Sequence, residues 1–248
     1  MKISERVLCA AEFVYNRFPH LRKALRPVYR VFFKNQYNKK KSDNFRHLVY
    51  DVMQKFDNCL DSCGVNYSLA FGSMLGAVRE GGIIGHDDDV DTFVWFEDNN
   101  YVKIRQALEK SGFILYRAMV VEDGILGREE TYIYNTIPID IFYIYQCDDN
   151  TPYTCGFKPL KGFTTLLLSM EATGRIQARK GEYPFVKKYI KVPFGNVKLP
   201  IMENYDEILK VSYGSNYMIP DPSWVPQGEE VNWDGVKAKL IYYNGKEL

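Results

Sequence analysis

One aspartate interrupts an otherwise uncharged stretch near the middle of this 248-residue chain. The stretch, Ile137–Tyr145, is rich in β-branched and aromatic residues and carries the single charge of Asp140, which predicts a largely buried strand. Burying an unpaired carboxylate costs several kcal/mol. The fold must therefore place this strand where a cation or hydrogen-bond donors reach Asp140.

A second group of acids precedes another β-rich segment. The run Asp87–Asp91 leads directly into Thr92–Phe96. In a strand, Asp89 and Asp91 share one face about 7 Å apart, and Asp87 joins them if the strand begins that early. Crowded carboxylates raise one another's pKa unless a cation lies between them, and groups of three hard oxygen ligands suit Mg²⁺ or Mn²⁺. The alternative is a solvated acidic loop.

Upstream of these acids the sequence predicts an anion site. A short strand over 65–71 ends at Gly72-Ser73, and a helix is expected from Met74 to Glu80, where Gly81-Gly82 breaks it. Glycine permits close approach to the backbone, serine supplies a hydroxyl, and the first amides of a helix attract negative charge. Because a divalent ion can neutralise phosphate and lower the pKa of an attacking hydroxyl, the three features together predict a metal-phosphate site.

Charge divides the chain into two parts. Residues 1–41 hold 11 Lys and Arg against 2 acids, whereas residues 42–248 hold 21 against 29. We therefore expect a basic amphipathic helical arm over 1–43 and a folded body over 44–248. The arm can lie on an anionic membrane surface, and the alternative is an arm that packs on the body with its lysines solvated. The acidic body disfavours a nucleic-acid binder, since such domains carry positive charge where they make contact.

Location and secondary structure follow from weaker signals. The sequence shows neither an apolar run that could span a bilayer nor a cleavage pattern, which favours the cytoplasm or the inner face of the membrane. Five cysteines without a C-x-x-C pair are expected to be thiols.

A helix is expected from Asn44 to Gly64, and another up to Lys110. The further elements expected are strands over 113–121, 131–136 and 137–145, and helices near 163–172 and 204–212.

Several motifs resemble the signature of the LicD family, which includes bacterial phosphocholine transferases and animal fukutin-type proteins. They are Gly72-Ser73-Met74-Leu75-Gly76-Ala77-Val78-Arg79, Gly82-Ile83-Ile84 and Asp87-Asp88-Asp89-Val90-Asp91. Ile137–Phe142 is similar to the second acidic strand of the family, and Val211–Pro220 to its closing Tyr-Gly-x-x-Tyr-Met. The resemblance covers about residues 45–222. This chain departs from the pattern at Ile83 and at Gly85-His86, where the family has Phe and Pro-Trp, which affects the shape of the neighbouring pocket.

The resemblance implies an α+β, nucleotidyltransferase-like fold of the DNA polymerase β superfamily, a mixed sheet packed by helices. It also implies a set of site residues. The expected catalytic acids are Asp87, Asp89, Asp91 and Asp140; the expected ligands of Mg²⁺ or Mn²⁺ are Asp89, Asp91 and Asp140; and the expected substrate contacts are Gly72, Ser73, Arg79 and His86. Asp140 has general base as its alternative role. For Arg79 the alternative is an ion pair with a site acid, and for His86 it is a surface loop.

By the same resemblance, the activity is transfer of a phospho-alcohol such as phosphocholine from a CDP-linked donor. The acceptor is a hydroxyl of a cell-surface glycan or its lipid-linked precursor, as in lipopolysaccharide or teichoic acid biosynthesis, and CMP is released. Two alternatives remain: a nucleotidyltransferase that moves NMP to a sugar or small molecule, and a non-catalytic glycan-binding relative. An Asp-x-Asp glycosyltransferase fits less well, since it leaves Gly72-Ser73 and Asp140 unexplained. The C-terminal third is expected to shape the acceptor pocket with the positive charges of Lys158, Lys161, Arg175, Arg179 and Lys180.

Overall fold

The computed structural model describes residues 35–85, 87–146, 150–221 and 230–248, with side chains from Phe45 onward except that of Glu230. The chain forms two compact units, residues 1–47 and 48–248. Residues 1–34 of the expected basic arm lie outside the described residues, and so does His86. Within the described part, no helix combines the length and the apolarity needed to cross a membrane.

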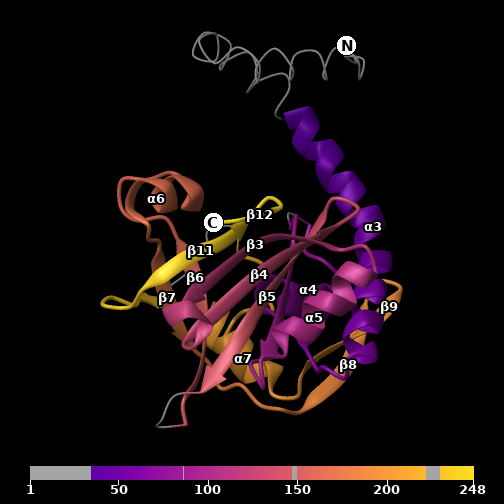
Figure 1. Cartoon of the computed structure of the whole chain (residues 1–248). Coiled ribbons are helices and arrows are strands. Elements are labelled where there is room, and N and C mark those ends of the chain that lie inside the picture. Colours follow the sequence, from indigo (N-terminus) through magenta and orange to yellow (C-terminus); the bar gives the residue numbers. More distant parts are fainter. Residues whose placement is uncertain (1–34, 86, 147–149, 222–229) are drawn as a thin grey trace, which may run out of the picture. The chain divides into compact units, whose positions relative to one another are not determined.

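The described elements are five α-helices, one 3₁₀ turn and twelve strands (Figure 1). The helices are α3 (Asn35–Ser62), α4 (Phe71–Glu80), α5 (Tyr101–Lys110), α6 (Leu166–Thr173) and α7 (Tyr205–Tyr213), and the 3₁₀ turn is Glu122–Gly124. The first six strands are β1 (Ser68–Leu69), β2 (Val90–Trp95), β3 (Ile114–Val121), β4 (Gly127–Tyr134), β5 (Ile137–Gln146) and β6 (Pro152–Lys158). The others are β7 (Gln177–Glu182), β8 (Tyr189–Phe194), β9 (Val197–Met202), β10 (Glu230–Asn232), β11 (Ala238–Tyr243) and β12 (Lys246–Glu247).

Ten of these strands form one mixed sheet, in agreement with the expected mixed sheet packed by helices. Its main path runs β10-β7-β6-β5-β4-β3-β11-β12, while β2 pairs with β5 and β1 pairs with β2. Only β2 and β5 run parallel among the described pairs. Strand β5 is therefore the centre of the sheet, with β2 along one edge and β4, then β6, along the other.

Alternation along β4 and β5 gives the sheet two different faces. One face lies against α5, because the Arg128 guanidinium of β4 sits 3.7 Å from the ring centroid of Tyr101 on that helix. The other face carries Asp140. The residues before and after it in the sequence, Ile139 and Ile141, are buried and point to the α5 face. Asp140 is itself buried, so the expectation of a charged residue inside a buried strand is confirmed.

Several expected boundaries are wrong in instructive ways. The strand expected over 65–71 is only β1, because the chain turns into α4 at Phe71 rather than Met74. Helix α3 begins before Asn44, since lysine and glutamine favour helix even where no apolar stripe marks it. The strand expected over 131–136 begins earlier, at Gly127, and ends at Tyr134, because Asn135 and Thr136 turn with φ of +46° and +72°.

The region after residue 150 contains more strand than we expected. Its helices α6 and α7 match the expectation, but β6 to β12 were not predicted. Each of these strands contains a charged residue, and β6 to β9 also contain proline or glycine, so the apolar alternation that marks a strand is interrupted. The β8–β9 hairpin serves the site indirectly: the Gly195 N–H donates to the Gly81 carbonyl, 2.7 Å, and holds the C-terminal end of α4.

Candidate active site

Three aspartates on or directly before two parallel strands meet in this structure. Asp91 and Asp140 are directly paired in the register of β2 and β5, and Asp89 lies just before β2. One carboxylate oxygen of each residue lies within 4.8 Å of those of the other two. The sequence placed Asp89 inside a strand; it lies one residue outside, in a bend, and still faces the same point. The parallel pairing is what brings together residues 49 positions apart.

A short network holds Asp140 in place. The Thr131 hydroxyl donates to its Oδ1, and the Arg117 Nη2 donates to its Oδ2 at 3.2 Å. The same Nη2 lies 3.6 Å from a Glu129 carboxylate oxygen, and the Arg117 Nε donates to the Thr131 hydroxyl at 2.7 Å. Both oxygens of Asp140 therefore accept hydrogen bonds, one from β4 and one from β3, and the side chain has one defined orientation.

Crowding and burial make these carboxylates harder to ionise. Burial, then the charges of Asp140 and Asp88, raise the pKa of Asp89 to about 6. Burial and the charges of Asp89 and Asp140 raise the pKa of Asp91 well above its ordinary value. Burial also raises the pKa of Asp140, against the opposing effect of Arg117 and Thr131. A cation held among the three would relieve this mutual repulsion.

The start of α4 lies against the acids. The Ala70 N–H donates to the Asp91 carbonyl at 2.9 Å, and the Asp91 N–H donates to the Ser73 hydroxyl at 3.0 Å. Phe71, the first helical residue, has φ of +41°, a strained value for a bulky side chain. Its ring is held edge-on by Phe93 and Phe142, with centroids 4.9 and 5.2 Å away. These contacts fix the first amides of the helix beside the aspartates.

Of the other expected residues, Gly72, Arg79 and Asp87 line the same cavity as the trio. Asp87 accepts a hydrogen bond from the Ile84 N–H at 3.3 Å, and a Cβ placed on Gly72 would point toward its carboxylate. Ser73 is buried, and its observed contact is with β2, so a substrate contact for it stays a prediction. Arg79 forms its ion pair with Glu80, 2.9 Å, rather than with an acid of the expected site.

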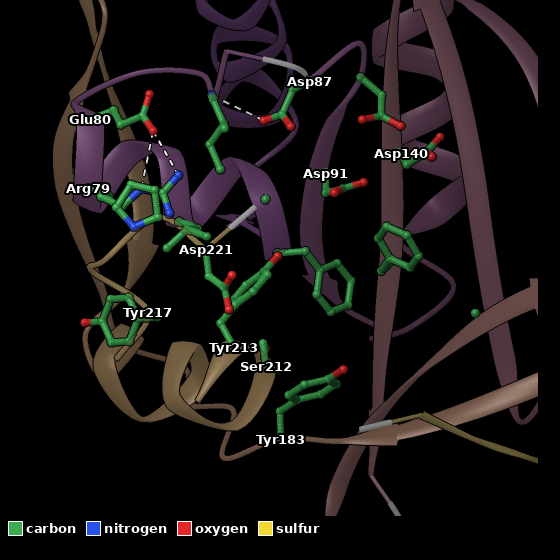
Figure 2. Close-up of a pocket in the computed structure, with 18 of the residues that line it drawn as sticks. Arg79, Glu80, Asp87, Asp91, Asp140, Tyr183, Ser212, Tyr213, Tyr217 and Asp221 are labelled. Carbon is green, nitrogen blue, oxygen red and sulfur yellow. Dashed lines mark hydrogen bonds and ion pairs between the residues drawn. The ribbon is translucent and has the colours of Figure 1, made fainter. Parts of the chain in front are cut away.

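The acids open into a cavity of about 1450 Å³. Figure 2 shows Arg79, Glu80 and Tyr217 on the side opposite Asp91 and Asp140. Besides the residues already named, the wall includes Phe157 and Arg179 from the β6–β7 pair, Tyr183, and residues of α7 and the segment after it. Arg179 is the one basic residue of those expected in the C-terminal third that lines this cavity. The volume exceeds that of a single small-ligand pocket and has room for a donor and an acceptor together.

The donor set suits a hard divalent cation. Asp89, Asp91 and Asp140 offer carboxylate oxygens alone, without a thiolate or imidazole in the group. Mg²⁺ prefers such oxygen ligands and retains waters and phosphate oxygens in its shell. The residues present therefore fit the metal expected from the sequence, and their role as its ligands stays a prediction.

Comparison with known proteins identifies the family. The family described as "LicD/FKTN/FKRP, nucleotidyltransferase domain" matches residues 64–201, which is more than half of the chain. The chain belongs to the LicD family. Ribitol 5-phosphate transferase FKRP of Homo sapiens is 27% identical over 172 residues, and that of Mus musculus 26% over 169. In each case 66% of this chain matches 31% of the relative, so the chain corresponds to about a third of those proteins.

Within this LicD domain, the sequence analysis missed Arg117, Thr131 and Glu129. A signal for Arg117 was available, because it is the only charge in the apolar stretch Phe113–Val121, as Asp140 is in its own strand. Glu129 and Thr131 gave no comparable signal, because Glu129 lies before the strand expected over 131–136 and Thr131 is an uncharged residue at its start. They are recognised only once β3, β4 and β5 are seen side by side.

Proposed function

We propose that this protein transfers a phospho-alcohol from a CDP-linked donor to a hydroxyl of a glycan and releases CMP. The observation that carries the proposal is the convergence of Asp89, Asp91 and Asp140 beside the start of α4 in a LicD domain. The related ribitol 5-phosphate transferases support a phospho-alcohol as the group that moves. We further propose that the fold is of the nucleotidyltransferase type, for which the family description and the two acid-bearing strands are the support.

In the proposed reaction, the acceptor hydroxyl attacks the phosphorus that bears the alcohol. A new P–O bond forms, the bond from that phosphorus to the CMP oxygen breaks, and the hydroxyl proton passes to a carboxylate of the site. A divalent cation bound to Asp89, Asp91 and Asp140 would neutralise charge on the diphosphate and make the hydroxyl more acidic. Such catalysis consists mostly of positioning and charge stabilisation.

The chain's own residues do the positioning. The first amides of α4, at Phe71 and Gly72, offer hydrogen-bond donors to the diphosphate, and glycine leaves room there for it. Both oxygens of Asp140 already accept hydrogen bonds, which favours a fixed ligand over a general base for this residue. The aromatic side of the cavity, with Phe142 and Tyr183, offers apolar faces on which a sugar or a base can stack.

The acceptor we propose is a cell-surface glycan or its lipid-linked precursor. The basic residues of the first 41 positions, which lie almost wholly outside the described residues, would then hold the protein at the inner face of the membrane. Sedimentation with anionic vesicles, before and after charge neutralisation of this segment, measures the contribution. Equal partitioning of the two proteins removes the membrane part of the proposal and leaves the chemistry untouched.

The chemistry is tested with a panel of CDP-alcohols (CDP-choline, CDP-ribitol and CDP-glycerol) labelled separately in the cytidine and in the alcohol. We expect Mg²⁺-dependent release of CMP with the labelled alcohol transferred to the glycan. Transfer of the cytidine label would instead indicate a nucleotidyltransferase, and no turnover with any donor would indicate a binding protein. Asp98→Asn, in an exposed loop, is the control for Asp91→Asn, which we expect to abolish turnover.

A further inference from the structure

One row of side chains crosses four strands of the sheet at the site. Arg117 of β3 is paired with Thr131 of β4, Thr131 with Asp140 of β5, and Asp140 with Asp91 of β2. Neighbouring strands lie about 4.8 Å apart, so Arg117 stands two strands from Asp140 and spans the gap with its long side chain. One end of the row is therefore the positively charged side chain of Arg117, and the other end holds the candidate metal ligands Asp140 and Asp91.

A β-bulge brings Arg117 into this row. The register of β3 with β4 shifts between Leu115, which faces Tyr132, and Arg117, which faces Thr131. Without that shift, Tyr116 would stand opposite Thr131 and the guanidinium would lie on the other face of the sheet. Bulges of this kind re-aim a side chain and are common next to active sites.

The guanidinium of Arg117 is held in one plane. Its Nε is fixed by Thr131, and its Nη2 lies between the carboxylates of Asp140 and Glu129. Its side chain is 29% exposed and lines the cavity. Among the described residues, the hydrogen bonds and ion pairs of Arg117 engage Nε and Nη2, which leaves the Nη1 edge for another acceptor.

Arg117 contacts more than Asp140. Glu129 adds a second carboxylate to the same nitrogen, so two acids together orient the guanidinium. Arg79, which also lines the cavity, forms its ion pair with Glu80 instead. A fixed planar fork beside the trio is suited to a phosphate oxygen, which arginine binds with directed hydrogen bonds.

We propose that Arg117 binds the second phosphate of the donor, the one that bears the alcohol, and that Glu129 and Thr131 are positioning residues for it. The inference rests on the proposed function, because it assumes a CDP-linked donor with its diphosphate at the trio. It adds to that function a residue that distinguishes a diphosphate from a monophosphate.

Calorimetric titration with CDP and with CMP, each in the presence of Mg²⁺, tests the assignment. In the wild type, we expect CDP to bind more tightly than CMP. In Arg117→Gln we expect the affinity for CDP to fall about 10- to 100-fold, as loss of a charge-assisted hydrogen bond predicts, and that for CMP to stay within about twofold. Arg117→Lys keeps the charge and loses the planar guanidinium. We expect its affinity for CDP to lie between that of the wild type and that of Arg117→Gln. The control is Arg105→Gln, which removes an exposed ion pair within α5 and does not line the cavity.

Three results would overturn the assignment. If Arg117→Gln loses affinity for CDP and CMP equally, or for neither, Arg117 does not bind the second phosphate. Loss of Mg²⁺ binding in the absence of nucleotide would show that it only supports the acids. If Arg117→Gln does not fold, the double variant with Glu129→Gln keeps the net charge of the site and carries the same test. A wild type that binds CDP no better than CMP would overturn the proposed donor itself, which is a separate outcome.

Discussion

At the scale of single residues, the site is a balance between repulsion and ligand binding. Asp89, Asp91 and Asp140 all have a raised pKa, because burial disfavours ionisation of each, and the charges of neighbouring carboxylates raise the pKa of Asp89 and Asp91 further. A folded-state pKa above the unfolded value means that the folded protein binds the proton more tightly. These acids therefore stabilise the fold at low pH, and that contribution is lost as the pH rises through the folded pKa.

The first prediction concerns pH and Mg²⁺. For Asp89 the window runs from the ordinary value of 3.8 to about 6, so the metal-free protein should lose stability as the pH rises through it. Above that window we expect Mg²⁺ to raise the melting temperature, and this rise should shrink toward a pH of about 5 as protons replace the cation. Thermal unfolding with and without Mg²⁺ measures both effects. If Mg²⁺ raises the melting temperature equally above the window and at a pH of about 5, the assignment of these acids as ligands is contradicted.

Gly72 provides the second prediction. A methyl group there would lie 3.8 Å from an Asp87 oxygen, an ordinary contact, so Gly72→Ala should fold normally. It would nevertheless occupy the space where we place the diphosphate, and we expect turnover to fall roughly tenfold or more. Gly76→Ala is the contrasting variant, because its Cβ would come 2.4 Å from the Gly82 carbonyl oxygen and should destabilise the fold by about 1–3 kcal/mol. Unimpaired turnover in Gly72→Ala would argue against a ligand at this turn.

The sequence was most informative about single residues with unusual surroundings. A lone carboxylate in an apolar strand identified Asp140, and the acidic run identified Asp89 and Asp91. Arg117 offered the same signal of a lone charge in an apolar strand, but its face of the sheet depends on the bulge before it. A one-residue shift of register moves the side chains of a strand to the opposite face of the sheet, and no local sequence pattern predicted this shift.

At the scale of elements, a contact after α7 helps to hold the wall opposite the acids. The Tyr217 hydroxyl donates to an Asp206 oxygen at 2.8 Å and ties the segment after Gly214 back to the helix. Asn216, Ile219 and Asp221 of that segment line the cavity. Burial, together with the bond to Asp206, raises the pKa of Tyr217 to about 12, so the hydroxyl keeps its proton at physiological pH.

We predict that Tyr217→Phe raises KM about two- to tenfold, the effect of one lost hydrogen bond, while kcat changes little. The reason is that the wall moves whereas the acids do not. Steady-state kinetics separate the two parameters. Lys210→Ala, which removes the other side-chain partner of Asp206, is the matched control and should change KM less. A fall in kcat with an unchanged KM would place Tyr217 in the chemistry instead.

The elements after residue 150 show why part of the fold was not predictable. Strand β7, with the sequence Gln-Ala-Arg-Lys-Gly-Glu, has no apolar alternation, yet it pairs with β6 on one side and β10 on the other. Its stability comes from partners distant in sequence rather than from its own residues. In contrast, the ends of α3 and α4 at Gly64 and Gly81, both with positive φ, were predicted from the glycines alone.

At the scale of the whole molecule, the two faces of the sheet have different roles: one carries the candidate site, and the other contributes to stability. The face with Asp140 holds the site, and the opposite face buries an ion pair between Arg128 and Glu130 at 2.7 Å. The hydroxyls of Tyr132 and Tyr143 both donate to Glu130. This cluster is polar and buried, and the hydrogen bonds described for it join its own members rather than cavity residues, with the Arg128 Nε left without a hydrogen-bond partner among the described residues.

Removing the Glu130 carboxylate should therefore affect stability and not chemistry. We predict that Glu130→Ala lowers the free energy of unfolding by about 3–5 kcal/mol, because it leaves the buried Arg128 charge uncompensated. Urea unfolding measures the loss, and kcat of the remaining folded protein should be close to that of the wild type. Glu203→Ala, which breaks an exposed ion pair with Lys188, should cost no more than about 1 kcal/mol. A stable Glu130→Ala protein with reduced kcat would contradict this division between the faces.

The central claim is that Asp89, Asp91 and Asp140 together hold a divalent cation. Titration with Mn²⁺, followed by the electron paramagnetic resonance signal of the free ion, tests it without any substrate. The account predicts saturable binding by the wild type and by Asp98→Asn, and its loss in Asp91→Asn and in Asp140→Asn. Equal Mn²⁺ binding by all four proteins, or none by the wild type, would contradict it.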